Sequence, residues 1–137
     1  MRALALVALF ACGHAKSPEP PAPRPEKSVQ LNKPGEPVAL DAHLVPGYVT
    51  VVDFWGEHCG ACVVVGGMLA VGVAQQDRVV IRKIDVGDGF TQVAKDYDIG
   101  ALPHYRIYDK QKRLRYDLVG NDCVKASDLA RELAAEP

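Results

Sequence analysis

The fold is decided by residues 49–62, VTVVDFWGEHCGAC. Six of the seven residues from Val49 to Trp55 are β-branched or aromatic, which is typical of a strand buried on both faces of a parallel sheet. Asp53 is the exception. A carboxylate in such a strand is costly to bury unless it has a partner or a task. Asp53 is therefore either an accident of the strand's end or a functional residue.

Two cysteines, Cys59 and Cys62, follow this strand at the predicted start of a helix. Their i,i+3 spacing places both sulfurs on one side of the first helical turn, close enough to join as a small-ring disulfide. The helix N-terminus offers free N–H groups and a positive dipole end, which stabilise a thiolate at Cys59. Such a thiol is the better nucleophile at neutral pH and the better leaving group, so the pattern indicates dithiol chemistry.

The segment DFWGEHCGAC resembles the active-site segment of thioredoxins, in which an acidic residue and an aromatic pair precede W-C-x-x-C. The matching residues are Asp53, Phe54, Trp55, Cys59, Gly60 and Cys62. His58 stands where the family usually carries a second tryptophan, and Ala61 stands where thioredoxin itself has proline. Residues beside and between the cysteines tune thiolate stability, so these departures affect the expected redox potential rather than the chemistry.

The second landmark is IGALPHY, residues 99–105. It resembles the family's loop in which a proline with a cis peptide bond precedes a strand and faces the cysteines. Cis bonds are nearly confined to proline, and the candidate bond is Leu102–Pro103; a trans turn proline is the alternative. Pro103 follows Cys62 by 41 residues, which leaves room for a helix, a strand and a helix. The resemblance implies that Pro103 and the backbone of Leu102 dock an extended substrate segment beside Cys59.

The remaining pattern predicts an α/β fold. After the cysteines we expect a helix continuing to about residue 76, a strand at 79–86 parallel to the first, a helix at 90–97, a hairpin at 104–109 and 114–119, and an amphipathic C-terminal helix at 124–133. Before them, a short edge strand at 38–40 and one helical turn at 41–44 leave little room for a full first helix. The expected fold is a thioredoxin-like three-layer sandwich with a central mixed β-sheet and a shortened first helix.

The resemblance also assigns roles around the cysteines. Asp53, buried behind the pair with a raised pKa, takes the Cys62 proton as general base through water. In thioredoxins a lysine on the next strand helps this aspartate; here Ile81 holds that position, and Arg82 and Lys83 are expected to face elsewhere. The residues expected to border the substrate groove are Trp55, Gly60, Ala61, Leu102, His104 and Gly120.

The first eleven residues, MRALALVALFA, carry one positive charge and about nine apolar residues, whereas a helical span needs ~20. They predict a signal peptide. Residues 9–12, LFAC, resemble a bacterial lipobox, in which Cys12 is lipidated and becomes the mature N-terminus. Gly13 then implies sorting to the outer membrane if the source is Gram-negative. The alternative is cleavage after Ala15 and release as a soluble secreted protein.

Residues 12–37 are expected to be a proline-rich linker, because residues 17–37 hold seven of the ten prolines. Such a segment cannot bury a core and should be an extended spacer, reaching on the order of 60 Å at ~3.1 Å per residue. The folded domain is then expected to occupy residues 38–137, on the periplasmic side of the membrane.

The predicted function is that of a protein-disulfide oxidoreductase, more a reductant than an oxidant, acting on disulfides or thiols of extracytoplasmic proteins. It needs no cofactor, but it needs a membrane electron-transfer partner that re-reduces or reoxidises the Cys59/Cys62 pair. A net charge of −1 argues against nucleic-acid binding. The four cysteines do not form a disulfide scaffold, and Cys123 has no sequence partner: it is either a buried free thiol or a redox-sensitive or intermolecular one.

Two other function classes stay open. One is a copper or zinc carrier that would use Cys59, Cys62, His58 and His104 as ligands, although proline at the cis position tends to exclude metal. The other is a non-catalytic tethered module that keeps the fold for partner recognition.

Overall fold

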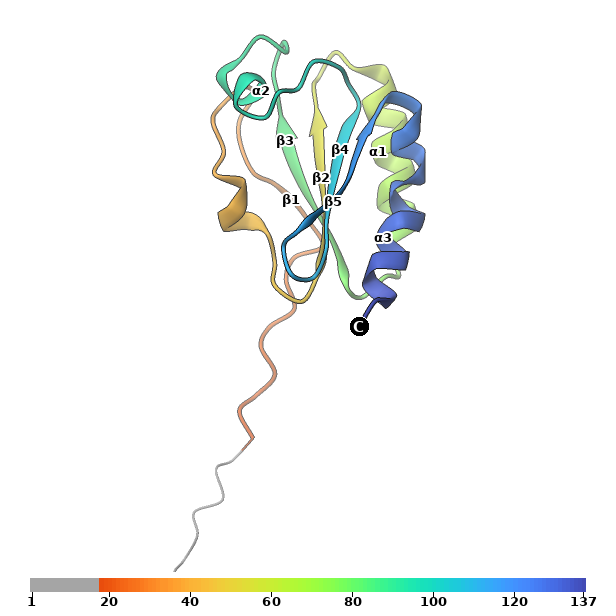
Figure 1. Cartoon of the computed structure of the whole chain (residues 1–137). Coiled ribbons are helices and arrows are strands. Elements are labelled where there is room, and N and C mark those ends of the chain that lie inside the picture. The colour runs from red at the N-terminus through yellow and green to blue at the C-terminus, as the bar shows by residue number, and fades with distance from the viewer. Residues whose placement is uncertain (1–17) are drawn as a thin grey trace, which may run out of the picture.

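The structure, a computed structural model, describes residues 18–137. The predicted signal peptide and the predicted lipidation site, Cys12, lie outside the described residues. Residues 18–27 form no helix or strand; the start of this segment extends away from the folded domain, whereas Lys27 is hydrogen-bonded to it (Figure 1). Within residues 18–137, none of the helices has the length and apolar character needed to cross a bilayer.

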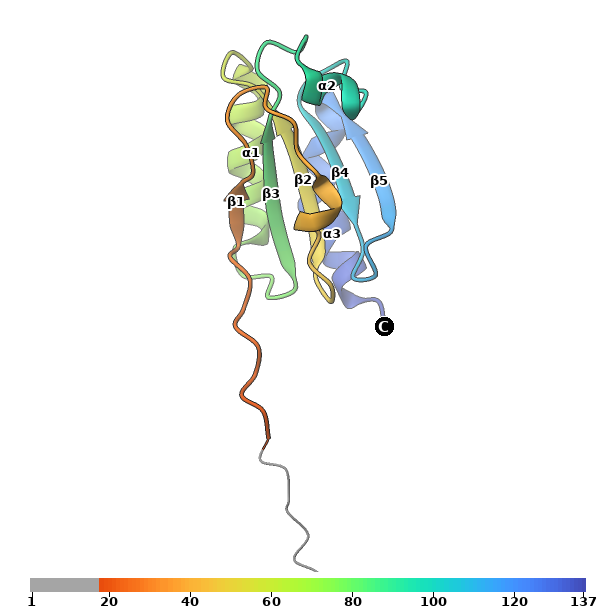
Figure 2. The same ribbon diagram turned by 90° about the vertical axis from the view of Figure 1, so that its left-hand side faces the viewer.

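A five-stranded mixed sheet forms the centre of the domain, in the order β1-β3-β2-β4-β5 (Figure 2). The strand that carries Asp53 is the central one, β2 (Val49–Trp55). It runs parallel to β3 (Val79–Asp85) on one side and antiparallel to β4 (His104–Tyr108) on the other. The edges are β1 (Ser28–Gln30), parallel to β3, and β5 (Leu114–Val119), antiparallel to β4.

Helices cover both faces of this sheet. One face carries α1 (Gly60–Val73) and α3 (Ala126–Ala135), and the opposite face carries α2 (Gln92–Asp96) and the 3-10 turn η1 (Leu40–His43) (Figure 1). A second 3-10 segment, η2 (Gly120–Lys125), leads from β5 into α3. The predicted three-layer sandwich with a mixed sheet is confirmed, and its first helix is reduced to η1.

β2 is buried on both faces, as its composition predicts. Val49 and Val51 pack in the core under α1 and α3, whereas Val52 and Phe54 pack in the core under α2 and η1. All four side chains are 0% exposed. Full burial of an apolar side chain of this kind contributes about 1.5–3 kcal/mol relative to exposure. The central strand therefore joins two cores, and any polar group on it is placed deep in the domain.

The folded unit begins earlier than the sequence predicted. We expected a linker up to residue 37 and an edge strand at 38–40, but residues 38–40 form no strand and β1 occupies the edge beside β3. Ile81 N donates to Lys27 O at 2.7 Å, and Leu31 N donates to Lys83 O at 2.8 Å. Residues 26–33 contain no proline, so their backbone N–H groups can pair. The high proline content of residues 17–37 as a whole led us to overlook this short proline-free stretch.

α1 is apolar all round, since it carries no charged residue. Its inward face is Cys62, Val65, Leu69 and Val73, whereas Val63, Val64, Met68 and Val71 are exposed. Val63 and Met68 thus lie outside the core. Gly72 allows α1 to approach α3 closely, because a Cβ there would lie 2.6 Å from Ser127 Cβ. Tertiary packing rather than intrinsic propensity therefore holds this valine- and glycine-rich helix.

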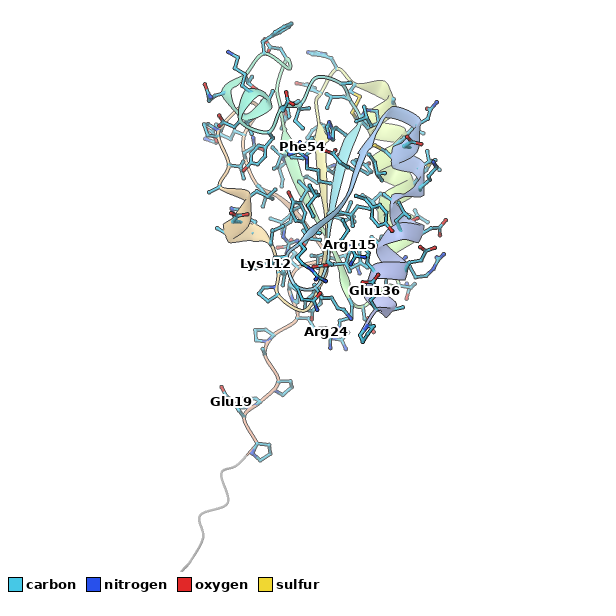
Figure 3. The ribbon with its side chains drawn as sticks, in the orientation of Figure 1. Glu19, Arg24, Phe54, Lys112, Arg115 and Glu136 are labelled. Carbon is cyan, nitrogen blue, oxygen red and sulfur yellow. A yellow bond between two sulfur atoms is a disulfide. The ribbon has the colours of Figure 1, made fainter. Side chains whose placement is uncertain are left out.

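The hairpin is tied to the end of α3 by ion pairs. Arg115 on β5 binds Glu136 at 2.9 Å and Asp109 at 3.3 Å, and Arg115 and Glu136 lie next to each other in Figure 3. Asp109 is 2% exposed and also accepts a bond from Arg113 Nε at 2.8 Å. A buried carboxylate requires such partners, so these arginines form a structural cluster rather than a binding surface for anions.

Candidate active site

The two cysteines of the predicted site form a disulfide at the start of α1. Cys59 is the N-cap residue, and its sulfur accepts a hydrogen bond from Cys62 N at 3.1 Å. The two Cα atoms are 5.2 Å apart, within the ordinary disulfide range. Cys59 is half-buried, whereas Cys62 is only 4% exposed. Cys59 is therefore the sulfur that an outside molecule can reach, and Cys62 is the sheltered one.

Asp53 lies on the same face of the sheet as α1 and is 2% exposed. A methyl group placed on Gly66 would lie 3.7 Å from Asp53 Oδ2. Gly66 is one turn beyond Cys62, and residues at i and i+4 share a helix face. Asp53 thus lies beneath the first turn of α1. Burial raises the pKa of Asp53 to about 6, and the nearby Lys83 ammonium partly opposes this effect. A carboxyl with such a pKa can both take and return a proton near neutral pH.

Lys83 faces the site, contrary to the expectation that it would point elsewhere. It is the direct register partner of Asp53, and its Nζ lies 3.9 Å from Asp53 Oδ2. The prediction considered only Ile81 as the position facing the aspartate. Side chains alternate along a strand, so Lys83 lies on the same face as Ile81. This alternation was the signal that could have identified Lys83 from sequence.

Trp55 ends β2 beside the active-site turn and is held from two sides. Its Nε1 donates to Gln30 Oε1 at 3.0 Å, and Lys83 Nζ lies 4.8 Å from its ring centroid. Gln30 belongs to β1, in the segment expected to be linker, and sequence reasoning gave no indication of this contact. Lys83 is therefore shared between the Trp55 ring and the Asp53 carboxylate.

The Leu102–Pro103 peptide bond is cis, as the resemblance implied. Pro103 O accepts hydrogen bonds from Gly120 N at 2.8 Å and from Cys123 Sγ at 3.5 Å. Gly120 has a φ of +61°, a conformation that favours glycine. Cys123 is a buried free thiol, 1% exposed, and burial raises its pKa to about 11. Of the two states predicted for Cys123, the structure supports the buried, unreactive one.

A pocket of about 290 Å³ lies beside the disulfide. Cys59 and Leu102 both line it, so the loop before the cis-proline and the cysteine at the helix start border one surface. His58 lines the same pocket, and Gly60 and Ala61 are exposed in the first turn of α1. Of the predicted groove residues, Leu102 thus lines the pocket together with the catalytic Cys59, and Gly60 and Ala61 are exposed next to Cys59 in the chain.

His104 does not belong to this groove. It is paired with Phe54 in the β2–β4 register, on the face opposite Asp53, and its ring packs edge-on against Phe54 at 5.8 Å. It is 6% exposed and its Nε2 contacts Asp117. A side chain held there cannot join Cys59 and Cys62 in a metal site or contact a substrate beside them. Among residues 18–137 no three His, Cys, Asp or Glu side chains are grouped so as to hold a metal ion.

Comparison with known proteins agrees with this geometry. The family model described as Thioredoxin matches residues 41–135. The chain is 33% identical over 60 residues to the thioredoxin of Mycoplasma pneumoniae, covering 44% of this chain and 58% of that one. It is 41% identical over 54 residues to the mitochondrial thioredoxin of Bos taurus, covering 39% of this chain and 32% of that one. The chain thus spans less than two thirds of these relatives.

Solved structures show the same fold. The thioredoxin of Malassezia sympodialis superimposes with a TM-score of 0.60 at 24% identity, covering 81% of this chain and 95% of that one. The reduced thioredoxin of Schistosoma mansoni gives a TM-score of 0.59 at 22% identity, covering 79% and 99%. The family model extends over more than half of the residues and includes both cysteines, Asp53 and the cis-proline. The chain belongs to the thioredoxin family.

Proposed function

We propose that the protein is a thiol–disulfide oxidoreductase that reduces disulfide bonds in proteins outside the cytoplasm. The observation that carries the proposal is the Cys59–Cys62 disulfide at the start of α1, placed above the buried Asp53. A reversible disulfide beside a carboxyl whose pKa is about 6 provides a nucleophile, a resolving thiol and a proton acceptor in one place.

The reaction starts from the dithiol form. The Cys59 thiolate attacks one sulfur of a substrate disulfide, that bond breaks, and the other substrate sulfur leaves as a thiolate that takes a proton from water. Asp53 then accepts the Cys62 proton, and the Cys62 thiolate attacks Cys59 Sγ. The Cys59–substrate bond breaks, and the second substrate sulfur leaves as a thiolate that takes up the proton held by Asp53. Two electrons pass to the substrate, and the Cys59–Cys62 disulfide remains.

Substrate docking follows from the pocket beside Cys59. An extended segment that carries the target cysteine can lie along the pocket and pair with the backbone before the cis-proline at Pro103, as a short added strand. Exposed Gly60 and Ala61 leave the approach to Cys59 open. The substrate class is therefore an extended protein segment rather than a small molecule enclosed in a cavity.

The reducing direction is supported by Asp53 and Gly60, which resemble the reducing branch of the family. The extracytoplasmic location is supported by the apolar residues 1–11 and the lipobox-like residues 9–12, with the proline-rich segment as a tether for a lipid anchor at Cys12. In that compartment the oxidised pair needs electrons from a membrane partner. Measuring the equilibrium potential of the Cys59/Cys62 pair against glutathione tests the direction.

The catalytic assignment is tested by trapping. The full chain with Cys62→Ser should accumulate a mixed disulfide with a substrate such as insulin, because Cys59 can attack but nothing resolves the product. The matched Cys59→Ser variant should accumulate none, and both should fail to reduce insulin. Equal trapping by the two variants would contradict these roles, and an inactive wild-type protein would favour the non-catalytic binding module.

The anchor is tested separately in cells. Mass spectrometry of the N-terminal peptide should find Cys12 carrying lipid, and Cys12→Ser should release the protein from the membrane fraction. A soluble wild-type protein cleaved after Ala15 would instead identify a secreted form.

A further inference from the structure

We propose that Tyr105 is a positioning residue for the dithiol step: its hydroxyl and the Asp53 carboxylate together hold the water through which Asp53 takes the Cys62 proton. The inference deepens the proposed function and rests on it. It concerns a side chain that neither the sequence nor the family resemblance assigns to the site.

Tyr105 and Asp53 are direct neighbours across the sheet. They are paired in the antiparallel register of β2 and β4, so both side chains point to the face covered by α1. Directly opposed residues in such a pair have Cβ atoms about 4.5–5.5 Å apart. Tyr105 is 0% exposed and Asp53 is 2% exposed, so water from bulk solvent does not reach either group freely.

Both groups have an oxygen with no partner among the described residues. Asp53 Oδ1 and Tyr105 Oη are buried and make no hydrogen bond to protein. Buried polar atoms in folded proteins are nearly always paired with protein or with ordered water. Two such atoms on adjacent strands, facing the same way, are best satisfied by one shared water, which donates to the carboxylate and accepts from the phenol.

Gly66 provides the space above them. A methyl group on Gly66 would lie 3.7 Å from Asp53 Oδ2 and 3.9 Å from Tyr105 Oη, so both side chains border the same point beneath α1. Gly66 and Cys62 share one face of the helix, one turn apart. A water held at this point therefore lies between the resolving sulfur and its proton acceptor.

The other groups facing Asp53 cannot replace the phenol. Lys83 from β3 approaches Oδ2 at 3.9 Å and leaves Oδ1 unpaired. The Cys123 thiol donates instead to Pro103 O and Leu118 O. α1 contributes no charged residue, and Cys62 is in the disulfide. Burial, reinforced by the Asp53 charge, raises the pKa of Tyr105, so the phenol keeps its proton and remains a donor.

The test measures the ionisation of Asp53 directly in the oxidised full-length protein, by carbon NMR of the labelled carboxyl. A hydrogen bond to the charged form lowers an acid's pKa, so Tyr105→Phe should raise the Asp53 pKa by about one unit. At pH 6 the ionised fraction of Asp53 should fall about five-fold, and release of a substrate thiol from the Cys59 mixed disulfide should slow by a similar factor. Tyr108→Phe, the same change on the opposite face of β4, should alter neither quantity.

Gly66→Ala tests the water without touching the phenol. Its methyl group would make ordinary van der Waals contact with Asp53 Oδ2 and Tyr105 Oη, so the variant should fold, but the methyl group would take up the space beside the carboxyl and the phenol that we assign to the water. It should raise the Asp53 pKa as Tyr105→Phe does. The proposal requires both shifts; an unchanged pKa in either variant, or an equal shift in Tyr108→Phe, overturns it. Because the titration needs no turnover, these outcomes are separate from a failure of the oxidoreductase assignment, which would appear as loss of wild-type insulin reduction.

Discussion

Replacement of Asp53 by asparagine should change how the stability of the oxidised protein depends on pH. The folded-state pKa of Asp53 is raised to about 6 from an ordinary value of 3.8. Between these values the folded state binds more protons than the unfolded state, so the free energy of unfolding falls as pH rises. A difference of about two units corresponds to about 3 kcal/mol. This loss of stability develops mainly between pH 3.8 and pH 6 as the pH rises, is absent well below pH 3.8 and is complete well above pH 6. Asparagine cannot ionise, so the variant does not show this pH-dependent loss of stability.

Urea unfolding of both proteins at several values between pH 4 and pH 7.5 measures the effect. The stability of Asp53→Asn minus that of the wild type should increase by about 2.5 kcal/mol across this range, because about 0.5 kcal/mol of the effect is already present at pH 4; any constant offset caused by the amide itself does not alter this increase. Tyr108→Phe should differ from the wild type by the same amount at every pH, because a phenol does not ionise there. A pH-independent difference for Asp53→Asn would refute the reasoning, since it would mean that burial does not perturb this carboxyl.

Three further predictions use the same measurements. Lys83→Met should raise the Asp53 pKa by about one further unit, because the opposing ammonium is lost; carboxyl NMR checks this, and a lower pKa would contradict it. Gly72→Ala should lower the free energy of unfolding, measured by urea unfolding, by about 1–2 kcal/mol, because the new Cβ would lie 2.6 Å from Ser127 Cβ. A variant as stable as the wild type, or more stable, would mean that α1 and α3 separate easily. Asp109→Ala should lower the free energy of unfolding by about 3 kcal/mol at pH 7, because two arginines and two backbone N–H groups lose a buried acceptor. A decrease below about 1 kcal/mol would show that water replaces the lost carboxylate.

Local patterns predicted the parts of the site that depend on neighbouring residues in the chain. The run of β-branched residues identified β2, the i,i+3 cysteines identified the start of α1, and their resemblance to thioredoxins identified the cis bond before Pro103. Each signal lies within about ten residues of sequence. The spacing between Cys62 and Pro103 then constrained what could lie between them. The architecture could be predicted because few sheet topologies allow a central strand to be followed by a parallel crossover and then by a hairpin.

The parts that sequence reasoning missed depend on the pairing of strands. Lys83 was assigned away from Asp53 because one position on β3 was aligned with the family lysine, although alternation places a second side chain on the same face. Tyr105 follows Pro103 by two residues and reads as an ordinary strand aromatic. Only the β2–β4 register brings its hydroxyl to the buried carboxylate. His104 was misplaced for the same reason, since one step along the strand moves a side chain to the other face of the sheet.

β1 shows how a segment with a linker's composition becomes part of the site. Proline excess argued correctly against structure in residues 18–26, where no strand or helix forms. The same reasoning was wrong for Ser28–Gln30, which form a strand, because three residues suffice for an edge strand when a neighbouring strand already presents free backbone groups. Through Gln30 this strand supplies the hydrogen bond to Trp55, whose ring in turn contacts Lys83, the cation nearest Asp53. The first strand of the domain is therefore connected to the buried carboxylate of Asp53 by one hydrogen bond, one cation–π contact and one ion pair.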